Sequence, residues 1–160
     1  MNIYLITYPD HVINESFHIN SLFESGLEFL HIRKPDFTIT ETEKLIKSIS
    51  HEFHNRISLH QHHELSSEFP LSRFHFTEEK RKLMIESAIK NQKKNSQTWS
   101  TSVHDINDYR NLPEEFDYCF FGPVFNSISK KDYKSELKNN FSVNEKPATK
   151  LIAIGGICEN

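Results

Sequence analysis

The sequence predicts an α/β protein built on a parallel sheet, and three observations lead to this prediction. Short apolar runs recur along the chain, they alternate with helical or polar segments, and several end in charged or glycine-rich positions. Such alternation is the pattern of parallel sheets whose faces are covered by helices. We expect a single domain over residues 1–160, because no linker or internal repeat divides the chain.

Seven short segments are predicted to be strands. They begin near Ile3, Glu28, Ile57, Arg73, Thr98, Tyr118 and Leu151. Seven strands with charged or glycine-rich carboxyl ends predict a TIM (β/α)8-type barrel in which the eighth unit is absent. Because the chain stops at Asn160, we expect either a fragment or a C-terminally incomplete barrel, whose open edges a homo-oligomer interface could cover.

Helices are predicted between these strands. Residues 14–25 place Phe17, Leu22 and Phe23 at roughly helical spacing before Gly26. The clearest helix is expected to start with a capping box of Thr40 and Glu43, followed by an apolar stripe of Leu45, Ile46, Ile49 and Phe53. Further helices are expected around residues 83–89 and after Asp105, whereas residues 61–72 are too few for a full helix.

Composition excludes several classes of partner. A net charge of −3 with interspersed acids and bases provides no field for binding nucleic acid. The longest apolar runs fall far short of the ~20 residues that cross a membrane, and the N-terminus lacks a basic, apolar leader. We therefore expect a cytoplasmic protein with no membrane partner, in which Cys119 and Cys158 are reduced and form neither a disulfide framework nor a zinc site.

Glycine is scarce, with four residues in 160. Neither the glycine-rich dinucleotide motif nor the phosphate-binding P-loop motif is present. Any phosphate must therefore be bound in another way.

Six segments, in sequence order, resemble the thiamine phosphate synthase/TenI superfamily. They are YLIT at 4–7, LHIRK at 30–34, FHF at 74–76, SVH at 102–104, DYCFFGPVFNSISK at 117–130 and AIGGI at 153–157. FGPVF and AIGGI are the most specific, and together the segments cover nearly the whole chain. The resemblance implies a TIM barrel with its site at the carboxyl ends of the strands, where the charged and glycine positions fall.

The resemblance also implies ligands for phosphorylated substrates. Arg33 would hold a pyrimidine diphosphate together with Lys34 and His31, which occupies the Gln position of the family motif. Three residues would join them at the family's Thr-x-Thr-Lys motif, namely Ser127, Ser129 and Lys130. Such donors stabilise the charge that builds up on a departing diphosphate. The backbone of Gly155 and Gly156 would approach a thiazole phosphate.

Synthases of this family bind Mg²⁺, and the sequence departs from them at the metal positions. His60 and Gln61 stand where synthases carry Asn-Asp, and Lys80 stands where they carry a second acid, although Glu78 or Glu79 could substitute. Magnesium prefers oxygen ligands. We therefore predict no metal site from the resemblance, and Mg²⁺ only if synthase activity is retained.

The segment SVH instead resembles TenI-type members, some of which are thiazole tautomerases. There His104 would be the general acid/base, with Ser102 beside it, and a His side chain suits this task near neutral pH. We favour a thiazole tautomerase of thiamine biosynthesis. The alternatives are a thiamine phosphate synthase that joins the pyrimidine diphosphate to the thiazole phosphate, and a non-catalytic ligand-binding or regulatory paralogue.

Other histidines allow two interpretations. His31 and His75 lie in apolar strands, where hydrogen-bonded inner residues are expected. His60 and His62 are two residues apart and could bind zinc with His63 or Glu64. A polar loop rich in histidine, however, needs no metal.

Overall fold

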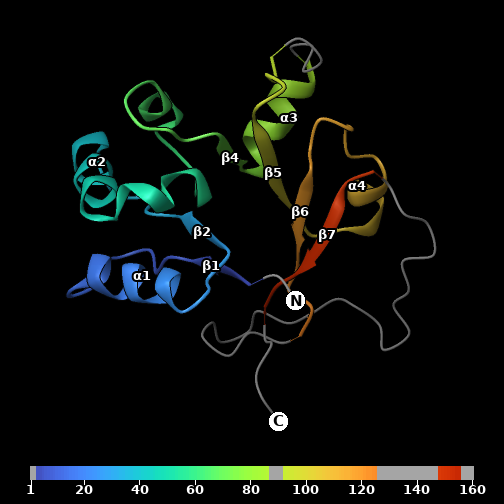
Figure 1. Cartoon of the computed structure of the whole chain (residues 1–160). Helices are drawn as coiled ribbons and strands as arrows, with labels where there is room; N and C mark the ends of the chain where they lie inside the picture. Colours follow the sequence, from blue (N-terminus) through green and yellow to red (C-terminus); the bar gives the residue numbers. More distant parts are fainter. Residues whose placement is uncertain (1–2, 87–91, 126–147, 156–160) are drawn as a thin grey trace. The chain divides into compact units, whose positions relative to one another are not determined.

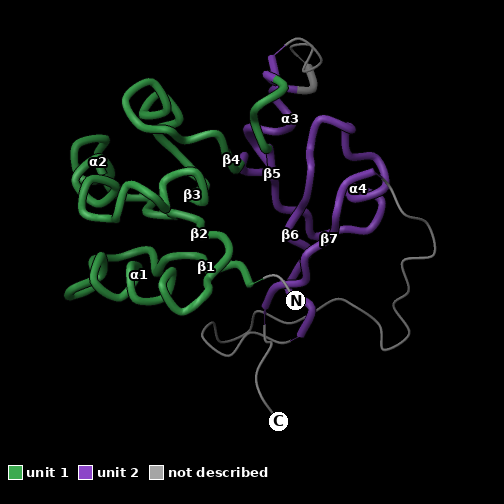
Figure 2. The backbone as a smooth tube through the Cα atoms, viewed as in Figure 1, with its two compact units in different colours: residues 1–75, 95–98 green, residues 76–94, 99–160 purple. Residues whose placement is uncertain are grey.

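The structure, a computed structural model, describes residues 3–86, 92–125 and 148–155 (Figure 1). The chain divides into two compact units, which are coloured separately in Figure 2. Unit 1 comprises residues 1–75 and 95–98, and unit 2 comprises residues 76–94 and 99–160. Within each unit the strands are parallel and neighbours follow chain order. The single domain expected from the sequence stays a prediction.

Unit 1 contains a parallel sheet with helices between its strands. The strands are β1 (Tyr4–Ile6), β2 (Phe29–Ile32), β3 (Ile57–Leu59) and β4 (Arg73–Phe76). The α-helices are α1 (Glu15–Glu24) and α2 (Ile39–Ser48), and the short 3-10 helices are η1 (His51–Arg56) and η2 (His63–Ser67). Each strand lies within the segment that the sequence predicts for it, because each contains apolar residues, consecutive in β1 and mixed with polar ones in β3 and β4.

The core of unit 1 lies between its sheet and its helices. Neighbouring strands contribute Leu30 from β2 and Ile57 from β3, which are directly opposite each other in the register. They pack in one cluster with Ile19 and Phe23 of α1 and Ile46 of α2. Burying the apolar side chain at each of these positions contributes about 1.5–3 kcal/mol of stability, which holds the helices on this face.

The buried face of α1 differs from the prediction. Phe17 is 68% exposed and Leu22 is also exposed, so neither contributes to the core. Ile19 and Phe23, which are four residues apart and therefore on the same side of the helix, are its buried residues. The prediction that the helix ends before Gly26 is confirmed.

The start of α2 also differs from the prediction. The capping box is formed by Thr38 and Glu41, two residues before the expected pair Thr40 and Glu43. The Thr38 hydroxyl accepts from the Glu41 backbone N–H at 3.2 Å, and the Thr38 backbone N–H donates to the Glu41 carboxylate at 2.8 Å. Both pairs have the T-x-x-E spacing, so the pattern alone could not choose between them.

The expected apolar stripe of α2 is divided between elements. Ile46 lies within α2, but Ile49 follows its end and Phe53 belongs to η1. All three are nevertheless in the core cluster of unit 1.

Unit 2 contains three parallel strands and two described helices. They are α3 (Glu78–Glu86), β5 (Thr98–Val103), α4 (Ile106–Arg110), β6 (Tyr118–Phe121) and β7 (Lys150–Ala153). α3 starts before the expected range 83–89, part of which lies outside the described residues. The Asp105 side chain caps α4 as predicted, accepting from the backbone N–H groups of Asn107 and Asp108.

Aromatic side chains fill the core of unit 2. The rings of Phe76 and Trp99 are 4.9 Å apart between centroids, and both rings lie near Phe116. Val103 and Phe121, which are opposite each other in the β5–β6 register, are also buried. Tilted and edge-to-face rings at these distances add attraction beyond the area that they bury.

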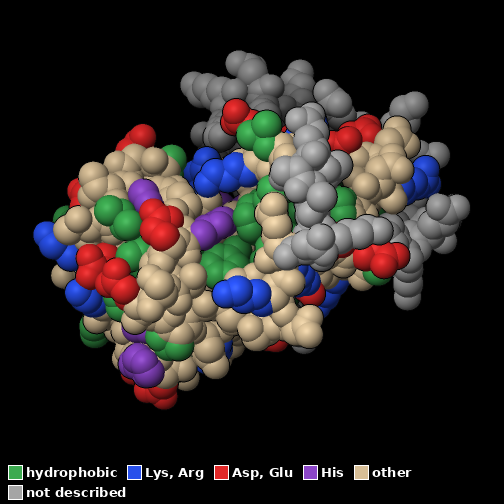
Figure 3. Space-filling view, turned by 90° about the horizontal axis from the view of Figure 1, so that it is seen from above, with side chains coloured by type: hydrophobic (Ala, Val, Ile, Leu, Met, Phe, Trp, Pro, Cys, Tyr) green, Lys and Arg blue, Asp and Glu red, His purple; other side chains and the backbone are tan. Residues whose placement is uncertain are grey.

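The surface is mixed in charge. On the face shown in Figure 3, acidic and basic side chains are interspersed rather than gathered by sign, which agrees with the small net charge. In the described part of the chain, no helix combines the length and the apolar character needed to span a membrane.

Candidate functional site

One face of the unit 1 sheet is polar. The register places His31, Ser58 and Arg73 side by side on adjacent strands β2, β3 and β4. Because alternate residues of a strand share a face, His60 lies on the same face as Ser58, and His75 lies on the same face as Arg73. This face is opposite to the one that packs on α1 and α2. Strands of buried parallel sheets are usually apolar on both faces, so the polar row requires a chemical explanation.

Three imidazoles of this row gather closely, and we call them the histidine cluster: His31, His60 and His75. Nδ1 of His31 lies 3.1 Å from Nε2 of His60, and the rings of His60 and His75 stack with centroids 3.9 Å apart. The exposed fractions of the three residues are 0%, 8% and 2%. Three polar rings are therefore held together inside the protein, away from solvent.

Burial keeps the histidine cluster neutral. Burial, followed by the positive charges of His63 and Arg33, lowers the pKa of His75 to about 3. The pKa of His31 is well below its usual value because of burial, then His75 and Arg73. The pKa of His60 is lowered in the same way, first by burial and then mainly by its neighbours in the cluster. Near neutral pH each ring therefore keeps one nitrogen lone pair.

The two predicted cations at the end of β2 have different surroundings. The Arg33 side chain is exposed, and its backbone is fixed by Thr7, whose hydroxyl accepts from the Arg33 N–H at 2.9 Å. Lys34 is fully buried, with its ammonium 2.7 Å from the Glu15 carboxylate and 2.6 Å from the Asp10 carbonyl oxygen. Lys34 is thus already neutralised within the protein, and a substrate-binding role for either residue stays a prediction.

The residues at the family's magnesium positions do not fit magnesium. His60 presents an imidazole, and Gln61 presents, in place of a carboxylate, an amide that donates to a backbone carbonyl. Lys80 is an exposed cation, and the carboxylate of Glu78 is 2.5 Å from the Lys82 ammonium. Mg²⁺ requires several oxygen ligands in octahedral geometry, and this set of side chains does not supply them.

In the part of the chain that the structure describes, the zinc ligands that the sequence allowed around His62 do not form a group of three, although Nδ1 of His62 lies 3.7 Å from the Glu64 carboxylate. Nε2 of His62 lies 2.9 Å from the Phe37 carbonyl oxygen, and Nε2 of His63 lies 2.9 Å from that of Leu59. Among the described residues, the group of possible metal ligands that comes together is the histidine cluster instead. Sequence reasoning missed this group, because only the strand register shows that rings 29 and 15 residues apart share one face.

In unit 2, His104 directly follows β5 and is exposed. Its Nδ1 lies 2.5 Å from the carbonyl oxygen of Gly122, at the end of β6. A carbonyl only accepts, so Nδ1 carries the proton and Nε2 of the neutral ring keeps its lone pair. The ring is therefore oriented with a basic nitrogen that can accept a proton. Ser102 lies two residues earlier on the same face of β5 and is partly buried.

The two most specific motifs lie side by side in unit 2. The backbone N–H of Val124 donates to the Ile154 carbonyl at 2.9 Å, and that of Phe125 donates to the Gly155 carbonyl at 3.1 Å. A Cβ at Gly122 would overlap the Ile154 carbonyl. A Cβ at Gly155, whose φ is 90°, would lie 2.9 Å from Cα of Pro123. Only glycine permits this approach of the two strand ends.

Four predicted ligands lie outside the described residues: Ser127, Ser129, Lys130 and Gly156. The other predicted residues fall into one group in each unit. His31, Arg33 and Lys34 are in unit 1, whereas Ser102, His104 and Gly155 are in unit 2. Their roles towards a substrate stay predictions.

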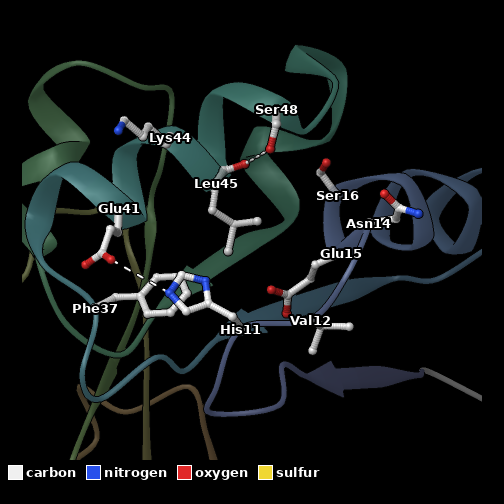
Figure 4. Close-up of a pocket in the computed structure, with 10 residues that line it drawn as sticks. All are labelled: His11, Val12, Asn14, Glu15, Ser16, Phe37, Glu41, Lys44, Leu45 and Ser48. Atoms are coloured by element: carbon white, nitrogen blue, oxygen red, sulfur yellow. Dashed lines mark hydrogen bonds and ion pairs between the residues drawn. The ribbon is translucent and has the colours of Figure 1, made fainter.

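Unit 1 contains a pocket (Figure 4). It is bordered by the segment before α1 and by α2. The His11 ring packs against Phe37 with centroids 4.4 Å apart, and its Nε2 is 3.7 Å from the Glu41 carboxylate. The lining contains Glu15, whose carboxylate is already paired with Lys34. No residue predicted to bind substrate lines this pocket.

The structure resembles a solved structure over nearly its whole length. That structure is the crystal structure of thiamine phosphate pyrophosphorylase from Bacteroides thetaiotaomicron, with a TM-score of 0.70 and 24% sequence identity. The similarity covers 98% of this chain and 73% of the other. The chain has the fold of a thiamine phosphate pyrophosphorylase.

This fold confirms the predicted α/β class of TIM type, and it is the fold that the resemblance implies. No protein-family model matches the sequence, and no curated protein matches it.

Proposed function

We propose that this chain is a cytoplasmic enzyme of thiamine biosynthesis that binds a thiazole phosphate and shifts a proton on it. Two observations support the proposal. The fold is that of a thiamine phosphate pyrophosphorylase, and His104 presents an exposed imidazole whose tautomer is set by Gly122. The second observation carries the choice of a tautomerase, because proton transfer requires an oriented group that both accepts and returns a proton.

The proposed step is an isomerisation. Nε2 of His104 takes a proton from one carbon of the substrate's conjugated system, while Nδ1 keeps its hydrogen bond to Gly122. The ring then returns the proton to another carbon of the same system, so the double bonds shift and no atom is gained or lost. A carbonyl next to Nδ1 stabilises the imidazolium that exists between the two transfers. No metal is needed for this step.

The phosphate of this substrate is proposed to bind near Gly155. Gly155 is exposed just after β7, and polar backbone groups of this kind bind phosphates in barrel proteins. Ser127, Ser129, Lys130 and Gly156 are proposed as further phosphate ligands on the basis of the sequence resemblance.

The test is a tautomerase assay on the full chain with the carboxythiazole phosphate tautomer as substrate. We expect His104→Gln to lower kcat by ~10²–10⁴-fold, the usual contribution of a general acid/base. The matched control is His18→Gln, which alters an exposed histidine of α1 in the other unit and should leave kcat unchanged. Activity that survives in His104→Gln would refute the proposed role.

A second candidate is the synthase reaction, which the name of the structurally similar protein favours. In that case Arg33 would be a diphosphate ligand. Incubation with the pyrimidine diphosphate, the thiazole phosphate and Mg²⁺ distinguishes the two, because only a synthase releases pyrophosphate. Release that depends on Mg²⁺ would overturn the preference for a tautomerase. Thiazole phosphate binding without either activity, unchanged in His104→Ala, would indicate the non-catalytic paralogue.

A further inference from the structure

We propose that His31, His60 and His75 form a binding site for a divalent transition-metal ion, with Zn²⁺ as the best-matched ion. The site would lie within unit 1, on three adjacent strands of one sheet. It does not include the proton-transfer group His104, and it does not depend on the proposed function.

The spacing of the three rings suits a metal ion. One ligand nitrogen from each ring can be chosen so that all three lie within 4.8 Å of one another. Zinc–nitrogen bonds of ~2.0–2.1 Å in tetrahedral geometry place ligand nitrogens ~3.4 Å apart. His31 and His60 already have nitrogens 3.1 Å apart. The rings of His60 and His75 are stacked, so binding one ion would require these two rings to rotate out of the stack and point their lone pairs at a common point.

The scaffold holds the rings where a metal needs them. Each comes from a different parallel strand or the residue after it, and the backbone hydrogen bonds of the sheet set their relative heights. The His60 backbone N–H donates to the Ile32 carbonyl at 3.2 Å, which ties His60 to the end of β2. Sites on strands are positioned more accurately than sites on loops.

The ligand set selects the kind of ion. Imidazole nitrogens suit zinc, copper, nickel and iron, whereas magnesium and calcium require oxygen. Three protein ligands leave a fourth position for a small molecule, as in catalytic rather than structural zinc sites. Arg33 and Arg73 add positive charge near the cluster, so an anion such as hydroxide is favoured at that position.

Metal binding at the cluster would also stabilise the fold. A metal ion would shift the equilibrium towards the folded chain, because it binds the assembled rings and not the separated ones.

The experiment uses the untagged full chain, stripped of metal with a chelator. Zn²⁺ is titrated by calorimetry in competition with a chelator of known affinity, and bound metal is counted by elemental analysis after dialysis. We expect one Zn²⁺ per chain and no binding of Mg²⁺. With Co²⁺ as the probe, we expect visible absorption bands of the strength typical of tetrahedral cobalt.

The decisive comparison is between His60→Gln and His18→Gln. The first removes a ligand at the most accessible position of the cluster, and the second removes an exposed histidine elsewhere in the same unit. We expect His60→Gln to lower zinc affinity by more than the ~10–100-fold caused by loss of an outer-shell partner. We expect His18→Gln to leave it unchanged, and circular dichroism verifies that both variants are folded.

His75→Gln is a second variant that lacks a ligand. If His75→Gln fails to fold, His60→Gln alone decides the test. Substoichiometric zinc in the unaltered chain would overturn the proposal. Equal zinc affinity in His60→Gln and His18→Gln would also overturn it, because the ion would then be bound by other residues.

Discussion

Unit 1 and unit 2 both contain parallel strands with a buried apolar face, but the opposite faces differ in chemistry. In unit 1 the opposite face carries imidazole and guanidinium groups from His31, His75 and Arg73. In unit 2 the β5–β6 register places hydroxyl groups and aromatic rings on the opposite face, among them those of Ser100 and Phe120. One face of each sheet therefore supports the fold, and the other is free to differ. Four predictions test this division, in order of decreasing effect.

The apolar faces should be equally important in both units. Leu59→Ala in unit 1 should destabilise the chain by about 2–5 kcal/mol and Phe121→Ala in unit 2 by about 3–5 kcal/mol, because each leaves a cavity in a buried core. Urea unfolding measures both. Ile13→Ala is the control, since Ile13 is 86% exposed and should change stability by under ~0.5 kcal/mol. A loss below ~1 kcal/mol at Leu59 or Phe121 would contradict the assignment of these faces.

The polar face of unit 1 should respond to paired substitutions. In metal-free protein, His31→Leu should destabilise by ~1–3 kcal/mol, because His60 loses its buried hydrogen-bond partner. Adding His60→Leu should recover part of this loss. Ser58→Ala is the matched control on the same face. The Ser58 hydroxyl is buried and has no hydrogen-bond partner among the described residues, so its removal should be neutral or stabilising. Additive losses in the double variant would show that the two rings are not coupled.

An alkaline pH dependence should arise from unit 2. Burial raises the pKa of the Cys119 thiol from about 9 to about 12. Between these values the unfolded chain loses the thiol proton and the folded chain keeps it, so stability is full below pH 9 and falls as pH rises. The fall should be roughly 1 kcal/mol between pH 9 and pH 10. Urea unfolding across this range should show that the free energy of unfolding of the unaltered chain decreases with pH. If the Cys119→Ala variant shows the same decrease, the effect does not arise from this thiol.

The smallest expected effect concerns the helix starts. Thr38→Ala should destabilise by ~1 kcal/mol, because it removes the hydroxyl of the α2 capping box. Asp105→Ala should have a similar effect on α4 of unit 2. Thr40→Ala is the control inside α2 and should cost less than ~0.5 kcal/mol. Thermal unfolding compares the three variants, and a larger effect at Thr40 than at Thr38 would favour the box expected from the sequence.

Strand positions could be predicted from the sequence because apolar residues recur in each strand, either consecutively or mixed with polar ones, between polar segments. Helix details could not. The two T-x-x-E patterns at Thr38 and Thr40 are equivalent until the backbone fixes where α2 begins. Phe17 is apolar and helically spaced, but its side of α1 faces solvent. Which apolar residues become buried depends on tertiary packing, which the pattern does not contain.

The candidate site was predictable only in part. His104 was found through its motif, yet its hydrogen bond to Gly122 depends on the β5–β6 register. His31 and His75 were expected as inner residues, but their meeting with His60 depends on pairing between strands far apart in sequence. Contacts between strands are set by register, and one sequence gives no direct reading of register.

The enclosed ammonium of Lys34 has a consequence for chemical footprinting. Amine-acylating reagents attack uncharged, solvent-reached lysines, and this group is both sealed from water and bonded to Glu15 and the Asp10 carbonyl. In the native chain it should resist modification while surface lysines such as Lys47 and Lys82 react. Its labelling rate would therefore report how often the segment preceding α1 detaches from the end of β2.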